Sequence, residues 1–222
     1  MTLPVVFDLD GTLVDSLPGI AAAANRFLSE QGRSPLPVER IGGFVGHGED
    51  VFLERLIGAG GLDPARFDDL KPRFSELYVA ASRDTTLFPG VAAMLEGFRA
   101  AGVPLGLCTN KSQGPTQVVL EAACLGAVFG AIVTGDSLPE RKPDPAPLQV
   151  VLSRLGATSG LYVGDSEVDA ETAARAGVPF ALYTEGLRTR SVAEIPHDHA
   201  FSDFRALAGI HAAAAKRERA RA

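Results

Sequence analysis

Apolar and polar residues alternate along this chain with two different periods, and these periods predict strands that alternate with helices. Short apolar runs of the kind that form buried strands occupy residues 5–9, 104–108, 127–133, 161–164 and 179–183. Amphipathic stretches such as GVAAMLEGFRAAG and PAPLQVVLSRLG lie between them, and most of these end on a glycine, the usual residue at a helix C-terminus. This alternation predicts an α/β fold with a doubly wound parallel sheet.

One interval departs from the alternation, because residues 10–103 are far more than a single crossover needs. We expect an inserted helical unit at residues 17–87, and a core formed by residues 1–16 together with 88–222. The insert has a helical pattern in LPGIAAAANRFLSEQG, GEDVFLERLIGAG and PARFDDLKPRFSELYVAASR, with a kink expected at Pro72. The glycine-rich loop ERIGGFVGHGED is typical of either a ligand cradle or a flexible turn.

Composition and charge narrow the class of protein. The 222 residues are 46% hydrophobic and 22% charged, as in ordinary globular proteins, and the net charge of -6 argues against a nucleic-acid-binding surface. The basic cluster KRERARA at the C-terminus is typical of a solvated helix end or a frayed terminus. We therefore expect no nucleic-acid partner.

The cysteines and the lack of long apolar runs indicate the compartment. Cys108 lies in the apolar run PLGLCT, and Cys108 and Cys124 are too few for a framework of disulfides, so a reducing compartment fits best. No run approaches the ~20 apolar residues of a membrane span, and the chain begins without a basic segment. The expected protein is soluble and cytoplasmic, a monomer or a homodimer, with no membrane partner.

Polar side chains follow the ends of several predicted strands. They are Asp8 and Asp10 in VVFDLDGTLVDS, then Thr109, Asn110 and Lys111, then Lys142 in ERKPDP, and Asp165 with Asp169 one helical turn later. Each residue alone is explained as well by a turn, a helix cap or an exposed position. Parallel strands bring their carboxyl ends to one edge of a sheet, where open α/β sheets hold ligands, so we expect the set to share one crevice.

Carboxylates beside a hydroxyl and an ammonium suit phosphoryl transfer. Such carboxylates favour a hard divalent cation, and Mg²⁺ commonly binds one or two of them together with waters and a phosphate oxygen. The hydroxyl of Thr109 and the ammonium of Lys142 are suited to hold phosphate oxygens and to neutralise their charge. The residues therefore favour phosphoryl transfer with Mg²⁺ as the cofactor.

Four segments resemble the motifs of the haloacid dehalogenase superfamily in order and spacing: FDLDGTLVDS, CTNK, KPDPAPL and VGDSEVDAETAARAGV. The chain resembles a phosphatase of that superfamily over nearly its whole length, and within it the phosphoglycolate phosphatase group most. The resemblance implies a Rossmann-like core, a helical cap inserted after the first strand, and Mg²⁺-dependent hydrolysis of a small phosphorylated metabolite, 2-phosphoglycolate. A sugar-phosphate phosphatase or phosphomutase of the same superfamily is the alternative, and a non-catalytic sensor of phosphorylated metabolites is a further one.

The resemblance also implies roles for individual residues. Asp8 is the expected nucleophile, which forms an aspartyl-phosphate, and Asp10 is the expected acid and base. Asp8, the backbone carbonyl of Asp10 and Asp165 are the expected ligands of Mg²⁺, and Asp169 is expected to orient these ligands without binding the metal itself. The phosphoryl group is expected on Thr109, Asn110 and Lys142, of which Thr109 and Lys142 also count as catalytic.

A cation near a small anionic substrate is also expected. His47 lies in GFVGHGEDVFLERL, which resembles the cap of phosphoglycolate phosphatases, and is the candidate for a substrate contact from the cap. Arg26 and Lys111 are the other candidate cations, and a surface or capping role is equally open for each. Two further patterns receive no site: HDH at 197–199 is expected in a surface loop, and DSEVDAETA lacks the glycine of a calcium loop.

Overall fold

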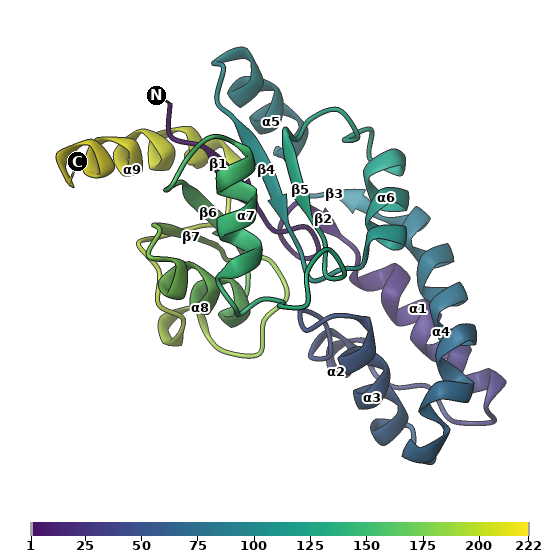
Figure 1. Cartoon of the computed structure of the whole chain (residues 1–222). Helices are drawn as coiled ribbons and strands as arrows, with labels where there is room; N and C mark the ends of the chain where they lie inside the picture. Colours follow the sequence, from purple (N-terminus) through teal and green to yellow (C-terminus); the bar gives the residue numbers. More distant parts are fainter. Residues whose placement is uncertain (1, 222) are drawn as a thin grey trace.

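A six-stranded parallel sheet forms the centre of the molecule in the computed structural model, which describes residues 2–221 (Figure 1). Its strands lie in the order β5-β4-β1-β6-β7-β8, and every neighbouring pair is parallel. They are β1 (Val5–Phe7), β4 (Leu105–Cys108), β5 (Ala131–Val133), β6 (Leu161–Gly164), β7 (Phe180–Tyr183) and β8 (His199–Phe201). The predicted α/β fold with a doubly wound parallel sheet is confirmed.

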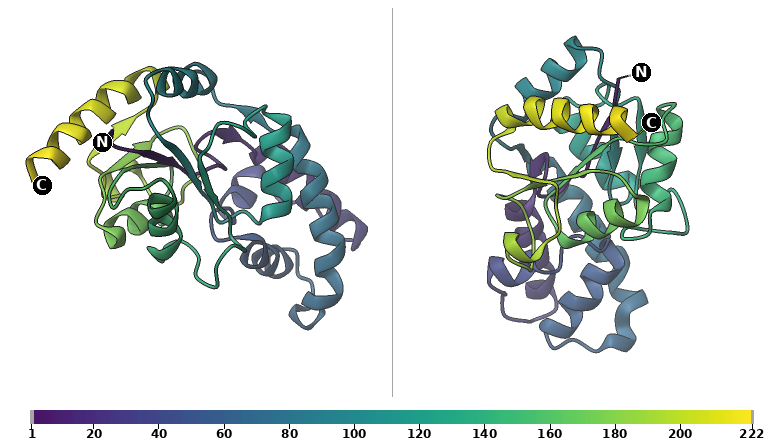
Figure 2. Two further views of the ribbon diagram at one scale, coloured as in Figure 1. Left: turned by 45° about the horizontal axis from the view of Figure 1, so that its top comes forward. Right: turned by 90° about the vertical axis from the view of Figure 1, so that its left-hand side faces the viewer.

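Helices cover both faces of this sheet (Figures 1 and 2). They are α5 (Val91–Ala100), α6 (Gln113–Ala122), α7 (Ala146–Arg154), α8 (Glu167–Ala176) and α9 (Leu207–Arg221). Val6 and Tyr162 belong to the apolar cluster under α7 and α8, whereas Val5 and Phe7 belong to the cluster under α5, α6 and α9. Because successive strand residues point to opposite faces and both faces are covered, the strands are apolar throughout, as in other buried parallel sheets.

Several strand boundaries differ from those expected. β1 ends at Phe7 because the carbonyl of Leu9 accepts hydrogen bonds from the amides of Leu13 and Val14 and so closes a turn. Residues 127–130 lie outside any strand, and β5 begins only at Ala131. β8 is not predicted because HAF is short and carries no apolar run. The expectation of a surface loop for HDH is therefore wrong for His199, the first residue of β8.

Helices α1 to α4 lie between β1 and β4 and pack around a hydrophobic core of their own. They are α1 (Leu17–Glu30), α2 (Val38–Gly42), α3 (Glu49–Ala59) and α4 (Phe67–Ala81), with 3₁₀ helices at Pro64–Arg66 and Ser82–Asp84. We call residues 17–84 the helical unit. At its centre the ring of Phe74 contacts the rings of Phe27, Phe52 and Tyr78. The sequence pattern missed α2, which is too short to show a period, and α4 continues through Pro72.

Two short strands join the helical unit to the rest of the molecule. The chain enters the unit through β2 (Val14–Asp15) and leaves it through β3 (Thr86–Leu87), and the two strands pair antiparallel with Val14 opposite Leu87. The chain therefore enters and leaves the unit at one place, next to the carboxyl ends of the parallel strands (Figure 1).

The remaining segments lie at the margins of the core. 3₁₀ helices at Val192–Glu194 and Phe204–Ala206 flank β8, and α9 extends away from the sheet toward the C-terminus (Figure 2). The basic cluster continues α9 as far as Arg221, and Ala222 lies outside the described residues. Cys108 is buried, Cys124 is exposed, and both are free thiols. Within residues 2–221, no helix has both the length and the apolar character to cross a membrane.

Candidate active site

The candidate residues meet where the chain changes direction across the sheet. From β1 at the centre, the chain forms β4 and β5 on one side and then β6, β7 and β8 on the other. Such a switch point leaves a crevice at the carboxyl ends of the strands. Asp8 follows β1, Thr109 follows β4 and Asp165 follows β6, so three adjacent strands bring side chains to this crevice.

Lys142 lies between two carboxylates in the crevice. Its Nζ is 2.8 Å from Asp8 Oδ1 and 2.8 Å from Asp169 Oδ1, and it donates a hydrogen bond to Tyr162 Oη at 3.0 Å. The side chains of Lys142 and Asp169 are 2% and 0% exposed. Solvent and salt screen such a buried pair weakly, so Lys142 fixes the positions of both carboxylates.

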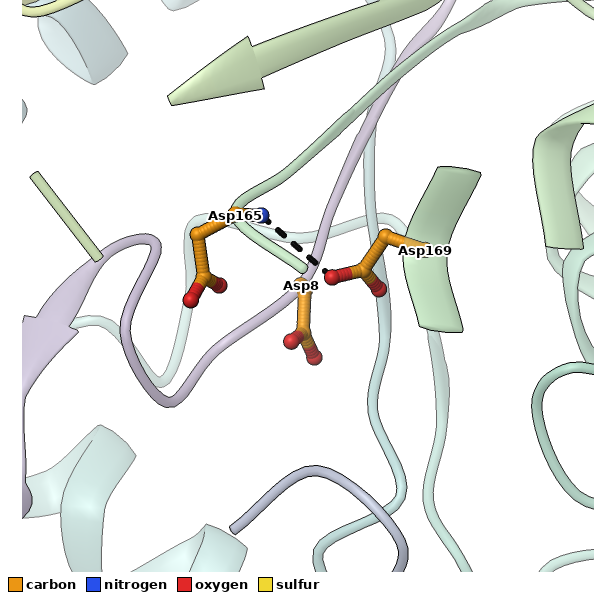
Figure 3. Close-up of side chains that lie close together, drawn as sticks. All are labelled: Asp8, Asp165 and Asp169. Carbon is orange, nitrogen blue, oxygen red and sulfur yellow. Dashed lines mark hydrogen bonds between the residues drawn. The ribbon is translucent and has the colours of Figure 1, made fainter. Parts of the chain in front are cut away.

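The N-terminus of α8 holds Asp169 in place. Ser166 and Asp169 form a capping box, in which the amide of Asp169 donates to Ser166 Oγ and the amide of Ser166 donates to Asp169 Oδ2. The amide of Asp165 also donates to Asp169 Oδ2, at 3.3 Å (Figure 3). Asp169 therefore has two roles, because one of its oxygens completes the capping box of α8 and the other binds Lys142.

Thr12 and a second loop fix the carboxylate of Asp165. Thr12 Oγ1 donates to Asp165 Oδ1 at 2.6 Å, and the amide of Leu187 donates to Oδ2 at 2.5 Å. Gly11, whose φ is 83°, and Gly186 leave room for this side chain, since a Cβ at either position would overlap it. The glycine after Asp10 is thus required by the close approach of Asp165 as well as by the turn.

An acidic cluster lies at the centre of the site. Asp8, Asp165 and Asp169 each offer a carboxylate oxygen within 4.8 Å of the others (Figure 3). Oδ1 of Asp8 is buried and faces Lys142 as an ion pair, but no group in residues 2–221 donates a hydrogen bond to it. A buried anionic oxygen without a donor is costly unless a cation neutralises it, and Lys142 supplies one positive charge to a cluster of three carboxylates. These residues therefore fit a hard divalent cation, which prefers carboxylate ligands.

Burial and mutual repulsion shift the pKa values of this cluster. Burial raises the pKa of Asp8 to about 7, with Lys142 opposing the rise and Asp169 adding to it. Burial also raises the pKa of Asp165 well above its usual range, with contributions from Asp169 and Asp8. Burial acts in the same direction on Asp169, but Lys142 together with hydrogen bonds from Ser166 and Tyr162 outweighs it, and the pKa of Asp169 is lowered. The three carboxylates resist ionising together, and a bound divalent cation would relieve that resistance.

Asp10 pairs with a second buried lysine. Lys111 Nζ lies 3.2 Å from Asp10 Oδ2, donates to Tyr78 Oη at 3.3 Å and lies 4.5 Å from the centre of the Tyr78 ring. The Lys111 side chain is 1% exposed, so the surface role considered for it is wrong. Burial raises the pKa of Tyr78 to about 12, although Lys111 opposes the rise, so the hydroxyl stays protonated near neutral pH.

The side chain of Asn110 joins the helical unit to the loop that carries Lys142. Its Nδ2 donates to the carbonyls of Gly46 and Lys142, each at 2.9 Å, and its Oδ1 accepts from the amide of Lys142 at 3.0 Å. The amide group of Asn110 is therefore already used by backbone groups. Thr109 lies next to it, and its Oγ1 accepts from the amide of Lys111 at 3.2 Å.

A small cavity separates the sheet edge from the helical unit. The sheet edge contributes Asp8, Asp10, Thr109, Asn110 and Lys111, and the helical unit contributes Val45, Gly46, Gly48, Phe52 and Tyr78. Its volume of about 20 Å³ has room for about one water molecule. The glycine-rich loop of the sequence therefore forms part of the wall of this cavity. A larger groove of about 370 Å³, beside α6, contains none of the expected catalytic residues.

The other two candidate cations do not line this cavity. His47 is half-buried beside Arg55, whose Nη1 lies 3.4 Å from His47 Nδ1, and burial together with Arg55 lowers the pKa of His47. Arg26 is exposed on α1 and pairs with Glu30 at 3.2 Å. Lys111 is the candidate cation that faces the cavity.

Sequence reasoning missed three hydroxyl groups of the site, those of Thr12, Tyr78 and Tyr162. Tyr162 Oη donates to Asp169 Oδ1 at 2.8 Å and lies 3.3 Å from the carbonyl oxygen of Cys108. A tyrosine inside the apolar strand LYVG was an available signal, because a buried hydroxyl requires a partner. Tyr78 gave no such signal, since only the packing of α4 against the sheet edge brings it to Lys111.

The chain is similar to known proteins along most of its length. The profile of a family described as haloacid dehalogenase-like hydrolase matches residues 5–183. A phosphoglycolate phosphatase of Cereibacter sphaeroides is 48% identical over 201 residues, which cover 89% of this chain and 92% of the relative. A phosphoglycolate phosphatase of Rhodobacter capsulatus is 39% identical over 212 residues, or 95% of this chain and 97% of the relative.

Solved structures have the same arrangement of elements. The crystal structure of a predicted phosphoglycolate phosphatase from Haemophilus somnus aligns with a TM-score of 0.89 at 30% identity, covering 94% of this chain and 97% of that one. A haloacid dehalogenase-like hydrolase from Bacteroides fragilis aligns with a TM-score of 0.83 at 28% identity, covering 93% and 100%.

Proposed function

Because the chain belongs to the haloacid dehalogenase-like hydrolase family and is a phosphatase, we propose that it hydrolyses 2-phosphoglycolate to glycolate and phosphate. The observation that carries this proposal is Asp8, whose buried carboxylate lies between Lys142 and Asp165 and also faces the small cavity. A nucleophile held in a narrow cavity suits a short ester. Relatives named phosphoglycolate phosphatase give the proposal its substrate.

Asp8 acts as the nucleophile in this proposal. A carboxylate oxygen of Asp8 attacks phosphorus in line with the leaving alkoxide and forms an aspartyl-phosphate, which water then hydrolyses. Lys142 keeps Asp8 in position and offsets charge on the transferred group, and the Thr109 hydroxyl donates to a phosphoryl oxygen. The side chain of Asn110 makes two hydrogen bonds to the backbone of Lys142, and in this way it helps to position Lys142 against the phosphoryl group.

Asp10 moves the proton. It stands two residues beyond Asp8 and faces the same cavity, so its carboxyl group can protonate the leaving alkoxide and later deprotonate the attacking water. Lys111 holds the Asp10 carboxylate from the side of the helical unit, at 3.2 and 3.3 Å from its two oxygens. Asp8, the nucleophile, thus pairs with Lys142, and Asp10, the proton carrier, pairs with Lys111, so the two carboxylates lie in different charge environments.

The cofactor in this proposal is Mg²⁺, held by Asp8, by the backbone carbonyl of Asp10 and by Asp165. When bound, Mg²⁺ would supply positive charge that neutralises the phosphate ester and its leaving oxygen. Thr12 and the amide of Leu187 orient Asp165 for that role. Asp169 contributes by fixing Lys142, since both its oxygens already accept hydrogen bonds.

The cap domain in this proposal spans residues 17–87, which are the helical unit and the segment that continues through β3, and it is inserted after β1 into a core of residues 1–16 and 88–222. Its separate apolar core and its connection to the rest of the chain through one pair of strands support an independent unit that moves as one body. The cavity of about 20 Å³ is too small for a substrate, so binding requires the cap to move outward and then close. Closure excludes water while the aspartyl-phosphate forms.

The test is phosphate release from 2-phosphoglycolate, ethyl phosphate, glucose 6-phosphate and p-nitrophenyl phosphate. We expect 2-phosphoglycolate to have the highest kcat/KM. Asp8→Asn should retain less than about a thousandth of wild-type kcat, because an amide is a poor nucleophile. Asp203→Asn is the matched control, since Asp203 pairs with Arg205 on the surface. Chelation with EDTA should abolish release, and added Mg²⁺ should restore it.

The other outcomes separate the alternatives. A higher kcat/KM for a sugar phosphate would leave the catalytic residues in place and contradict the proposed substrate. Transfer of phosphate between sugar positions would indicate a phosphomutase. If wild type and Asp8→Asn release equally little phosphate from every ester, the enzyme hypothesis gives way to a sensor of phosphorylated metabolites.

A further inference from the structure

Lys111 is a buried cation whose charge the attack on phosphorus does not require. Lys142, not Lys111, contacts the nucleophile Asp8. Among the cavity-lining residues in the described part of the chain, Lys111 alone carries a positive charge, and its side chain is 1% exposed. An ammonium group removed from water is costly unless acceptors surround it; Asp10 supplies one anionic partner, and the cavity that the ammonium also borders is where a second anion would meet it.

Two hydrogen-bond donors, Lys111 Nζ and Tyr78 Oη, lie side by side at this end of the cavity. The ammonium of Lys111 has three N–H groups, and within residues 2–221 its acceptors are the Asp10 carboxylate and Tyr78 Oη. Two of the three contacts go to the oxygens of one carboxylate, at 3.3 and 3.2 Å, so a ligand that replaces one of them leaves the ion pair with Asp10 in place. The Tyr78 oxygen accepts from Lys111, which leaves its own O–H free to donate. These two donors lie 3.3 Å apart, measured from Nζ to Oη.

We propose that Lys111 and Tyr78 bind the carboxylate of the substrate, one donor to each of its oxygens. This inference rests on the proposed function and names the part of the site that selects an ester carrying a carboxylate. A charged donor beside a neutral donor suits a carboxylate, which accepts strong, charge-assisted hydrogen bonds. Because Lys111 comes from the core and Tyr78 from α4, the carboxylate would also link the cap to the sheet edge.

The positions of the neighbouring groups support this assignment. Asp8 and Thr109 face the cavity where the phosphoryl group is expected, and Lys111 follows Thr109 by two residues on the same loop. A molecule that reaches from Thr109 to Lys111 is therefore short, with an anionic group at each end. Val45 and Phe52 form an apolar wall and offer no donor to hydroxyl groups of a longer substrate.

The test compares two esters of nearly equal size, 2-phosphoglycolate and ethyl phosphate, which differ by a carboxylate in place of a methyl group. The quantity measured is the ratio of their kcat/KM values in wild type, Lys111→Met and Tyr78→Phe. The ratio cancels any effect of Lys111 on Asp10, which acts on both esters alike. Hydrogen bonds to charged groups contribute enough that we expect the ratio to fall about 10- to 150-fold in Lys111→Met, and less in Tyr78→Phe.

Each result has a distinct meaning. If both variants lower kcat/KM equally for the two esters, Lys111 serves Asp10 alone, the inference is overturned, and the proposed function stands. If wild type does not prefer 2-phosphoglycolate to ethyl phosphate, the proposed substrate is wrong and the inference fails with it. Lys71→Met is the matched control, because Lys71 pairs with Asp50 on the surface of the helical unit and should leave the ratio unchanged. Tyr78→Phe removes one oxygen atom from the ring and tests the site even if Lys111→Met does not fold.

Discussion

Replacing Lys142 by methionine removes the charge that lies between Asp8 and Asp169 and keeps most of the length of the side chain. In the wild type its Nζ is 2.8 Å from an oxygen of each carboxylate, and the three side chains are at most 10% exposed. The substitution leaves two buried carboxylates without their common cation. Removing one partner of a buried ion pair costs ~3–5 kcal/mol, which for a chain of this size corresponds to a Tm lower by about 6 to 20 °C.

The deficit should depend on pH with a definite sign. Burial raises the pKa of Asp169, but in the wild type Lys142 lowers it below its ordinary value, so ionised Asp169 stabilises the fold at neutral pH. Without Lys142 the burial effect remains and the largest cause that opposes it is lost, so the pKa of Asp169 in the folded state rises and its ionisation costs stability relative to the wild type. Protonation relieves this cost as the pH falls, so the difference in Tm between wild type and variant should be largest at about pH 8 and smaller at about pH 5.

Thermal unfolding followed by far-ultraviolet circular dichroism measures this effect, and the chain has no tryptophan to serve as a fluorescence probe. EDTA is present throughout, so that a metal does not compensate the carboxylates. Lys71→Met is again the control, because the pair of Lys71 with Asp50 is exposed and contributes about 0–1 kcal/mol. A Lys142→Met variant with the same Tm as wild type, or with a deficit that is equal at both pH values, would refute the reasoning.

Two further predictions concern residues that position the site. Asn110→Ala removes three hydrogen bonds that join Gly46, Asn110 and Lys142, and we expect kcat/KM to fall about 10- to 100-fold. The control is Asn25→Ala, which loses hydrogen bonds only within the helical unit and should lower the Tm without lowering kcat/KM. Equal kcat/KM values for the two variants would contradict the role of Asn110. Gly11→Ala places a side chain at a φ of 83° and in overlap with Asp165, so it should lower the Tm and raise the Mg²⁺ concentration needed for half-maximal activity. The control is Gly32→Ala, at a φ of 67° in open space, which should lower the Tm without changing the Mg²⁺ requirement. Equal Mg²⁺ requirements for the two variants would count against the overlap with Asp165.

The sequence by itself determined the alternation of strands and helices in the core and most of the residues proposed for the site. Apolar runs with polar ends identified β1, β4, β6 and β7, because a parallel sheet buried on both faces needs continuous apolar strands. The same rule placed Asp8, Thr109 and Asp165 at one edge, since parallel strands end on the same side of a sheet. Strand boundaries were less certain, because a hydrogen bond in a turn, such as those to the carbonyl of Leu9, ends a strand without changing its apolar pattern.

Only the tertiary structure decided how these residues are paired. Spacing along the chain places Asp8 and Asp10 together, yet Asp8 contacts Lys142 and Asp10 contacts Lys111. The pairing of Asp10 with Lys111 and Tyr78 depends on where α4 packs against the sheet edge, which no local pattern encodes. Nothing in the sequence favoured one of Lys111, His47 and Arg26 over the others as the cation near the substrate. The structure distinguishes them, because Lys111 lines the cavity and Arg26 lies on the surface. Local patterns fix which side chains are available, whereas contacts between distant segments fix their charges and their partners.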